Sequence, residues 1–194
     1  MMRKAKNEWL RKIIHLAAAV FPLLYQYVLN RAEMLLLCSI LLVLLFLGEV
    51  LRTYTVYFKR LYLKTLGFLL REEEETTIIN GATYLMGGIS LSVLAFPAEV
   101  AVISMWVVIL ADSAAALVGT HWGRHRLGDK SYEGSAAFIV VSAGIMLAGG
   151  IPPLMAFSVA LILGIVELIP GRFNDNLILP VVTGVVLTIG ENLI

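Results

Sequence analysis

The chain alternates long apolar segments with short polar ones over its 194 residues. A helix rises about 1.5 Å per residue, so a run of about 20 apolar residues crosses the roughly 30 Å hydrocarbon core of a bilayer. Most apolar segments approach that length, although two of them are shorter. The pattern predicts seven membrane-spanning helices, at about residues 13–29, 33–51, 82–96, 99–119, 135–150, 152–170 and 177–191.

The composition supports a membrane protein. Hydrophobic residues make up 59% of the chain and charged residues 15%, with a mean hydropathy of +0.87. These values exceed what a soluble domain carries. We therefore expect an all-α, polytopic membrane helix bundle in which residues 1–194 form a single domain, without a signal peptide. The single cysteine, Cys38, excludes an internal disulfide and a cysteine-rich metal site.

The cationic residues orient the chain. Every Lys and Arg except Arg31 falls at the N-terminus or in a loop that would share its side of the membrane. By the positive-inside rule, the N-terminus is cytoplasmic and the C-terminus lies outside. The net charge of +1 says little about partners. We expect no nucleic acid partner, and the oligomeric state stays open.

The longest loop, residues 52–71, reads as an amphipathic helix. Its aromatic and aliphatic residues share one side at 100° per residue, while Arg52, Arg60, Lys64 and Arg71 fall on the other. This pattern predicts an interfacial helix on the inner leaflet, with its cations near anionic headgroups. The run Glu72–Glu75 that follows is typical of a solvated loop, and a share in metal binding is the alternative.

Charged groups beside hydrocarbon are costly and are candidates for function. Asp112 lies seven residues from the inner end of its span, and Glu167 and Asp175 approach the same side from other segments. Three carboxylates near a cationic loop point to a divalent metal that bridges to phosphate oxygens. Alternatively, Asp112 is neutral or pairs with Arg124 or His121 in simple helix packing, which small residues at Ala111, Ala115 and Gly119 favour.

The loop at residues 120–134 supplies the opposite charge. Arg124, Arg126 and Lys130 can neutralise phosphates, and Gly123, Gly128 and Gly134 let a backbone approach closely. These cations can also serve only to orient the chain. Ser131 and Ser135 can cap the next helix or donate to a phosphate, and Glu133 can begin that helix or bind metal. The sequence contains no Walker A, kinase or GxGxxG pattern of a soluble nucleotide-binding fold.

Four segments resemble the CTP-dependent lipid kinases that include dolichol kinase, phytol kinase and the yeast-type diacylglycerol kinase. They are EWLRKIIH (8–15), GATYLMGG (81–88), ADSAAALVGTHWGRHRLGDKSYEGS (111–135) and VELIPGRFNDNLILP (166–180). The third is the most specific and the fourth discriminates best. One departure is visible, because the family commonly has Gly where this chain has Ala111.

The resemblance implies an integral membrane enzyme that transfers the γ-phosphate of CTP to a lipid alcohol, with Mg²⁺ or another divalent cation. We expect an isoprenoid acceptor such as a polyprenol, dolichol, phytol or geranylgeraniol, and an active site on the cytoplasmic face. Together with the charge pattern described above, we expect Asp112, Lys130, Asp175 and His15 to take part in catalysis, and Asp112, Glu167 and Asp175 to bind the metal. The expected nucleotide-binding residues are Arg11, Lys12, Gly119, Arg124, Lys130, Ser131, Glu133, Gly134, Ser135 and Asn176.

Phosphoryl transfer asks a protein mainly to position groups and to neutralise charge. We expect Lys130, with Arg124, to stabilise the transferred phosphate, and Asp112 or Asp175 to accept the hydroxyl proton. His15 is an alternative base because its unperturbed pKa suits that role, and a hydrogen-bonded interfacial histidine is the simpler interpretation.

Two other functions stay open at this point. The third segment also resembles CDP-diacylglycerol synthase, which attaches CMP to phosphatidate, but the C-terminal signature of that enzyme is absent here. A transporter with a buried carboxylate relay would also place acids inside spans. Transporters usually contain internal repeats and midplane charges, and neither is visible in this sequence.

Overall fold

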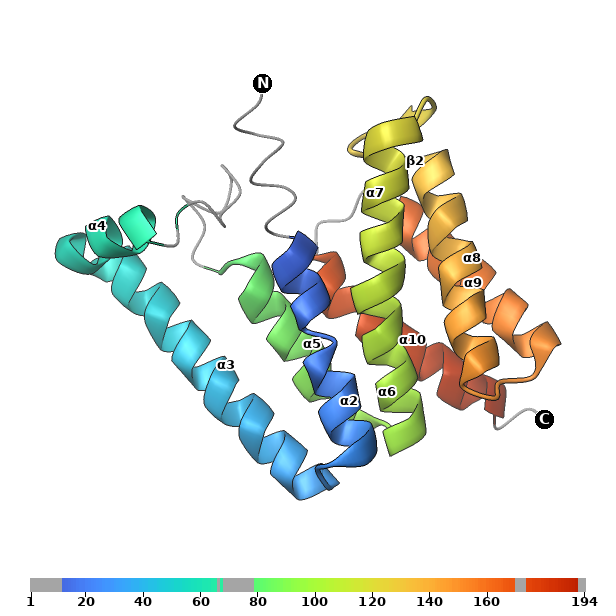
Figure 1. Ribbon diagram of the computed structural model, residues 1–194, viewed down its shortest axis with the longest axis horizontal. Helices are drawn as coiled ribbons and strands as arrows, with labels where there is room; N and C mark the ends of the chain where they lie inside the picture. The colour runs from blue at the N-terminus through green and yellow to red at the C-terminus, as the bar shows by residue number, and fades with distance from the viewer. Residues whose placement is uncertain (1–11, 66, 68–78, 170–173, 192–194) are drawn as a thin grey trace.

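The chain, seen in a computed structural model that describes residues 12–65, 67, 79–169 and 174–191, is a bundle of helices (Figure 1). Residues 12–17 form a helical turn before the first labelled helix. The helices are α2 (Val20–Tyr27), α3 (Arg31–Tyr54), α4 (Val56–Thr65), α5 (Gly81–Ala95), α6 (Ala98–Trp106), α7 (Asp112–Trp122), α8 (Tyr132–Ala148), α9 (Pro153–Leu168) and α10 (Asp175–Glu191). Each of the seven predicted apolar segments therefore contains a helix.

The helices differ in whether they are long enough to cross a bilayer. Among the described residues, two are long and apolar enough, α3 with 24 residues and the continuous stretch Ala98–Trp122 with 25. The shorter apolar helices α5, α8, α9 and α10 have 15, 17, 16 and 17 residues. At 1.5 Å per residue they rise about 22 to 26 Å, less than the hydrocarbon thickness. The mainly helical fold is confirmed, and the count of seven spans stays a prediction.

Local sequence explains where several helices begin. Asn30 accepts a hydrogen bond from the backbone N–H of Glu33, and the Glu33 carboxylate accepts one from Asn30 N–H, forming a capping box for α3. Asn80 caps α5 by accepting from Thr83 N–H. Ser131 caps α8 in the same way through Gly134 N–H. These caps satisfy backbone groups that a helix leaves unpaired at its start.

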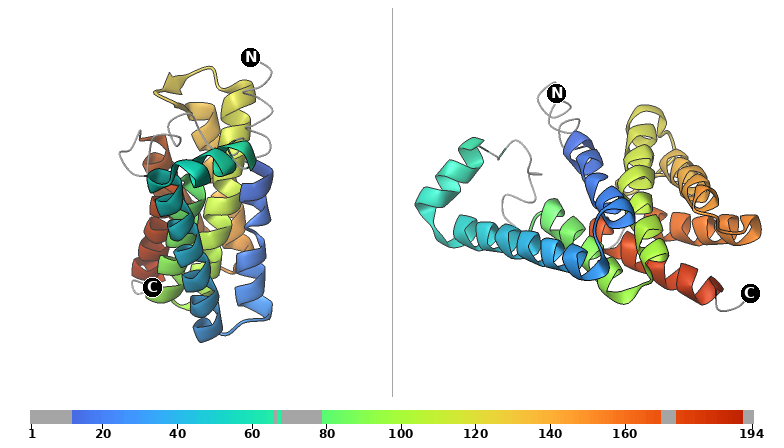
Figure 2. Two further views of the ribbon diagram at one scale, coloured as in Figure 1. Left: turned by 90° about the vertical axis from the view of Figure 1, so that its left-hand side faces the viewer. Right: turned by 60° about the horizontal axis from the view of Figure 1, so that its bottom comes forward.

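The predicted interfacial helix at residues 52–71 is wrong in its boundary. Because α3 continues through Tyr54, Arg52 belongs to α3 and is buried beside Glu49 instead of facing headgroups. The separate helix α4 lies across the end of α3 (Figure 2), and Arg60 and Lys64 are exposed on it. Residues 66 and 68–71 lie outside the described part. The sequence pattern missed the break because an amphipathic stripe does not mark where a helix bends.

The loop predicted at residues 120–134 contains a small hairpin, an exception to the expected all-α fold. Strand β1 (Arg126–Leu127) pairs antiparallel with β2 (Lys130–Ser131), with Leu127 opposite Lys130. Gly128 has a φ of 62° and occupies the first turn position, where glycine tolerates positive φ. Residues 123–125 connect the end of α7 to the hairpin, which leads into α8.

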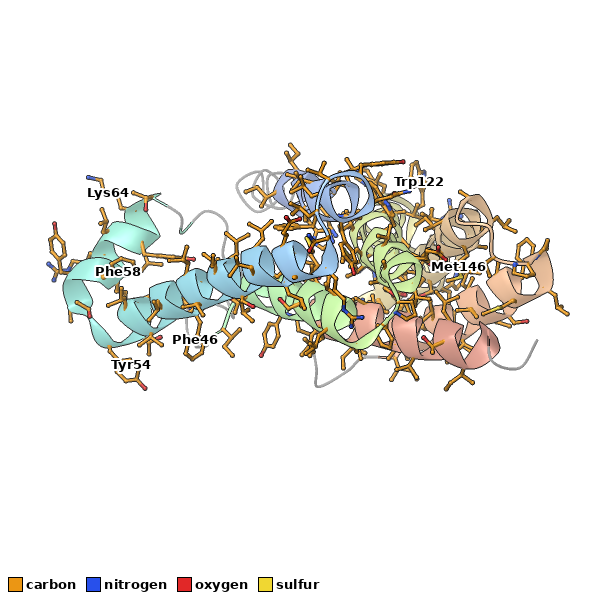
Figure 3. All side chains as sticks on the ribbon, turned by 90° about the horizontal axis from the view of Figure 1, so that it is seen from below. Phe46, Tyr54, Phe58, Lys64, Trp122 and Met146 are labelled. Carbon is orange, nitrogen blue, oxygen red and sulfur yellow. The ribbon has the colours of Figure 1, made fainter. Side chains whose placement is uncertain are left out.

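The core forms around α6 and the π-helical residues Val107–Ala111 that continue it, and α3 joins the core only near its start, through Met34 and Cys38. Most of Ala98–Trp122 is buried, whereas α3 is largely exposed along its apolar length. Figure 3 shows the side chains of Phe46 and of Tyr54, the last residue of α3, projecting outward from that helix. Extensive exposed apolar surface is expected where lipid is the surrounding solvent. The hairpin, α4 and residues 12–17 all lie toward the upper side of the bundle in Figure 1, with α4 at the left and the hairpin at the right.

Helices α5 and α10 are in close contact at Gly88. A Cβ atom there would lie 2.4 Å from the Asn176 carbonyl oxygen and 2.7 Å from Pro180 Cγ. Because a backbone oxygen cannot move aside like a side-chain end, only glycine fits without shifting one helix. This contact holds the beginning of α10 against α5.

We predict that Gly88→Ala lowers the melting temperature in detergent by about 3 to 10 °C, corresponding to about 1 to 3 kcal/mol of overpacking. Gly144→Ala is the matched control, since a Cβ at Gly144 meets nothing within 4 Å. Alanine in an open helical position is neutral or slightly stabilising. Equal melting temperatures for the two variants would contradict the close α5–α10 contact.

Candidate nucleotide and phosphate site

The Lys130 ammonium lies at the centre of a cluster of charged groups. Its Nζ is 2.9 Å from Glu167 Oε1 and 2.5 Å from Asp175 Oδ2. Lys130 comes from β2, Glu167 from the end of α9 and Asp175 from the start of α10. The structure therefore gathers three of the predicted site residues, which are separated by 37 and 45 positions in sequence.

The hairpin and the cap of α8 place Lys130 and its neighbours. Ser135 donates its hydroxyl to Glu167 Oε2 at 2.5 Å, so both oxygens of this buried carboxylate have partners. Ser131 is also buried, and its Oγ accepts from Gly134 N–H at 3.1 Å. Of the two roles considered for Ser131, helix capping is the one that its hydrogen bond serves.

The glycines Gly119 and Gly134 let α7 and α8 approach beside this cluster. A Cβ at Gly119 would lie 2.8 Å from Ser131 Oγ, and one at Gly134 would lie 2.8 Å from the Ala115 carbonyl oxygen. Gly119 also accepts a hydrogen bond at its carbonyl oxygen from Arg126 Nη2 at 3.2 Å. Gly119 thus contributes to packing and to holding the hairpin.

Asp112 lies directly after a short π-helix, Val107–Ala111, within the long central helix. Lys12 Nζ and His15 Nε2 each lie 3.9 Å from Asp112 Oδ2. The alternative partners Arg124 and His121 are not the ones found: His121 Nδ1 is 2.9 Å from the Leu117 carbonyl, and Arg124 is exposed. The cations beside Asp112 come from the N-terminal helix instead.

His15 is fixed by the π-helix. Its Nε2 lies 3.0 Å from the Val108 carbonyl oxygen. Because a carbonyl only accepts, Nε2 must carry the hydrogen and donate it. A π-helical turn displaces backbone carbonyls from their usual partners and recurs at functional sites. The hydrogen bond to Val108 therefore occupies Nε2, which is also the His15 nitrogen nearest to Asp112.

The electrostatics of the cluster favour a charged lysine. Burial alone lowers the pKa of Lys130, but attraction and hydrogen bonding to Asp175, with the fields of Asp112 and Glu167, outweigh burial and raise it. Burial raises the pKa of Asp175, and repulsion from Asp112 and Glu167 adds to the rise despite Lys130. Three carboxylates thus share the field of one central ammonium.

Glu133 faces away from this centre. Its Oε1 lies 2.8 Å from His125 Nδ1, and the His125 backbone N–H donates to both carboxylate oxygens at 3.2 and 3.3 Å. The hydrogen bond from His125 lowers the pKa of Glu133 to about 2. The geometry ties the hairpin to the first turn of α8, which agrees with Glu133 as a helix-start residue.

The remaining predicted residues are placed as follows. Asn176 donates through Nδ2 to the Gly81 carbonyl oxygen at 2.9 Å, which joins α10 to α5. Lys12 lies near Asp112 as described. Arg11 lies outside the described residues. Asn176 therefore contacts protein backbone next to the cluster.

The carboxylates fit a divalent cation in chemistry, because Asp112, Glu167 and Asp175 are hard oxygen donors. Within the part of the chain that the structure describes, however, no group of three His, Cys, Asp or Glu side chains converges on one point. Lys130 lies between Glu167 and Asp175. The metal set therefore stays a prediction.

Sequence reasoning missed two features of this region. Asn80 precedes Gly81 in the second resemblance segment, and an Asn before an apolar helix is a recognisable capping signal. The π-helix at Val107–Ala111 has no such signal, since its five residues are uniformly apolar. Its effect on His15 follows only from a contact between residues 93 positions apart.

We predict that Lys130→Met destabilises the protein by about 3 kcal/mol, because it leaves the buried Glu167 and the nearby Asp175 as unbalanced like charges. Burial and the neighbouring carboxylates already raise the pKa of Asp175 against the opposing effect of Lys130, so without Lys130 protonation of Asp175 relieves the repulsion at a higher pH. The loss should therefore shrink as the pH falls from about 7 to about 5. Melting temperatures in detergent at several pH values measure it.

Adding Glu167→Gln to Lys130→Met should restore part of that stability, since one buried charge is removed. Lys64→Met, at an exposed position on α4, is the control and should melt like the unmodified chain. A Lys130→Met variant that melts like Lys64→Met at every pH would show that the charge cluster does not hold these segments together.

The comparisons with known proteins point to lipid kinases. No family model matches the chain, and no solved structure matches it. An uncharacterized protein of Rickettsia prowazekii is 28% identical over 182 residues, which cover 88% of this chain and 88% of that one. The CTP-dependent diacylglycerol kinase 1 of Schizosaccharomyces pombe is 32% identical over 139 residues, which cover 70% of this chain and 63% of the kinase.

The CTP-dependent diacylglycerol kinase 1 of Saccharomyces cerevisiae is 30% identical over 140 residues, which cover 70% of this chain and 48% of the kinase. The chain thus spans less than two thirds of the length of either kinase. Neither name mentions a polyprenol or dolichol acceptor. The similarities support the expected family at the level of CTP-dependent lipid kinases.

Proposed function

We propose that this protein is a CTP-dependent lipid kinase that transfers the γ-phosphate of CTP to the hydroxyl of a membrane lipid. One observation carries the proposal: Lys130 is held by Glu167 and Asp175 at the end of apolar helices, in the field of Asp112. A cation and several carboxylates at the rim of an apolar bundle suit a charged phosphate donor and a lipid acceptor. The similarity to kinases with CTP in their names supports this assignment.

In this proposal Lys130 supplies positive charge to the transferred phosphoryl group, which is the main demand of phosphoryl transfer. Glu167 and Asp175 orient Lys130 through the contacts described above. Glu167, Asp175 and Asp112 are also the residues that would hold a divalent cation. Such a cation, when bound, would neutralise charge on the CTP phosphates.

We assign the proton-accepting role to Asp112. Its contacts to Lys12 and His15 are 3.9 Å long, beyond hydrogen-bonding distance. Asp175, in contrast, already accepts a short hydrogen bond from Lys130. His15 donates from Nε2 to the Val108 carbonyl, so it acts by holding the helix before Asp112 and not as the base. Lys12 places an ammonium group, and His15 an imidazole N–H, beside the Asp112 carboxylate.

The site is proposed to face the cytoplasm, within a single catalytic domain. The hairpin with Lys130 lies on the same side of the helix bundle as α4 and residues 12–17, the upper side in Figure 1. These segments carry cations that the positive-inside rule assigns to the cytoplasm. CTP would then reach the site from water, while the lipid hydroxyl approaches from the bilayer.

For the acceptor we propose a neutral lipid alcohol, with diacylglycerol as the first candidate because both named kinases are diacylglycerol kinases. The isoprenoid alcohols expected from the sequence are the second candidate class. Purified protein offered equal amounts of diacylglycerol and a polyprenol with CTP and Mg²⁺ should phosphorylate the diacylglycerol at least several-fold faster. Faster phosphorylation of the polyprenol would make an isoprenoid alcohol the preferred acceptor, and the reaction would still be that of a lipid kinase.

The reaction class is tested with CTP that carries label in the γ or the α phosphate, in parallel reactions with diacylglycerol, polyprenol and phosphatidate. We expect label in the lipid product from the γ position alone. Transfer from the α position would instead identify a cytidylyltransferase of the CDP-diacylglycerol synthase type. Absence of transfer from both positions would contradict the enzyme assignment and favour the transporter.

We predict that Asp112→Asn lowers kcat at least about 100-fold while the melting temperature stays within a few degrees, because a removed general base typically costs a factor of 10² to 10⁴. Asp129→Asn, in the exposed turn of the hairpin, is the matched control and should retain full turnover. Wild-type turnover in Asp112→Asn would refute the assigned role.

A further inference from the structure

A second polar network lies between α3, α4 and α5, in addition to the Lys130 cluster. It begins at a buried ion pair within α3, where Arg52 Nε donates to Glu49 Oε2 at 2.8 Å. Glu49 is 2% exposed and Arg52 3%. The Arg52 guanidinium lies over the Tyr62 ring of α4, 5.5 Å from its centroid. This cation–π contact holds the ring of Tyr62 against the end of α3.

Tyr62 connects this pair to the start of α5. The Asn80 amide donates through Nδ2 to the Tyr62 hydroxyl at 3.2 Å. The other end of the same amide caps α5, since Asn80 Oδ1 accepts from Thr83 N–H at 3.0 Å. Asn80 is buried, so both of its polar atoms need partners. The hydrogen bond to Tyr62 thus fixes the amide that caps α5.

The start of α5 in turn holds the start of α10. The carbonyl of Gly81, the residue after Asn80, accepts from Asn176 Nδ2 at 2.9 Å. The Asn176 carbonyl oxygen faces Gly88, where the two helices are in close contact. Asn176 follows Asp175, whose carboxylate binds Lys130. A continuous set of contacts therefore runs from α4 to the proposed catalytic centre.

We propose that Tyr62 and Asn80 are positioning residues for the reaction: their hydrogen bond fixes the start of α5 and, through Asn176, the direction of the Asp175 carboxylate that orients Lys130. The hydrogen bonds described above join these two residues to each other and to the start of α5. The inference rests on the proposed kinase activity for its kinetic consequence, whereas its structural part stands on the contacts alone.

Catalysis is sensitive to small displacements of the segments that hold the reacting groups. Because a misplacement of about 1 Å can cost on the order of 100-fold in rate, contacts that hold a catalytic backbone matter without contacting substrate. Loss of one neutral hydrogen bond allows the start of α5 to move but leaves the cap and the packing at Gly88 in place. We therefore expect a loss of about threefold to tenfold in kcat, with little change in KM for CTP.

The first test is a double-mutant cycle. Tyr62→Phe removes the hydroxyl, and Asn80→Ser keeps a good capping residue but is too short to reach Tyr62. Each variant should lower kcat by a similar factor, and the double variant should lose no more than either one. Additive losses would show that the two residues act independently and would overturn the proposal.

A conservative replacement and a matched control sharpen the cycle. Asn80→Asp keeps the capping oxygen and accepts a hydrogen bond from the Tyr62 hydroxyl, so it should retain at least half of wild-type kcat. Tyr57→Phe removes a hydroxyl from an exposed position of the same helix, where Tyr57 is 79% exposed. It should match the wild type. A Tyr57→Phe loss as large as that of Tyr62→Phe would assign the effect to α4 in general.

Hydrogen–deuterium exchange separates this inference from the kinase assignment. Tyr62→Phe should accelerate amide exchange in peptides covering residues 174–180 at least about threefold, while Tyr57→Phe leaves them unchanged. If the wild type transfers no phosphate, the kinase assignment fails and this exchange result alone decides the structural coupling. If Tyr62→Phe and Tyr57→Phe both leave amide exchange at residues 174–180 unchanged, the proposal is overturned, whether or not the protein transfers phosphate.

Discussion

The ion pairs of Lys130 with Glu167 and Asp175 are the interaction on which the functional end of the molecule depends. Glu167 is almost fully buried, and a buried carboxylate without a cation costs several kcal/mol. The hairpin, the end of α9 and the start of α10 must therefore meet, because only their meeting balances these charges. Ser135 completes the coordination of Glu167 from α8. The same requirement that closes the fold at this end thus also concentrates charge where a phosphate donor needs it.

Close helix approach makes that meeting geometrically feasible. Gly119 and Gly134 bring α7 and α8 together beneath Ser131, and Gly88 brings α5 against the first turn of α10. In lipid, apolar side chains gain little from leaving their surroundings, so helices associate through close packing and polar contacts. In the sequence these glycines indicated only helix packing. In the structure they let the polar side chains of neighbouring helices reach one another. The glycine contacts that pack the helices are therefore also required to assemble the charged site.

Hydropathy predicted the positions of the helical segments well, because each apolar segment must satisfy its own backbone in a helix. It predicted neither the hairpin nor the environment of Arg52. Two-residue strands carry no alternating pattern, and the Gly128–Asp129 pair between them is a turn signal without strands long enough to recognise. Arg52 fitted an interfacial stripe, but its partner Glu49 and the Tyr62 ring lie on surfaces that a helical projection of residues 52–71 does not contain. The residues of the Lys130 cluster were individually predicted from charge and resemblance, whereas their pairing required the three-dimensional structure.

The charge balance of the cluster constrains how a phosphate can be accommodated. Lys130 is already bound to two carboxylates, and its raised pKa follows from them. A phosphate that draws Lys130 away leaves Glu167 and Asp175 without their cation, which the burial of Glu167 makes costly. Binding of the nucleotide must therefore either keep Lys130 between its carboxylates and the phosphate or bring another positive charge to those carboxylates. Since the Glu167 oxygens are fixed by Ser135 and Lys130, the start of α10 with Asp175 is the part of the cluster best able to adjust. The contacts that anchor this segment to α5 then set how far it moves.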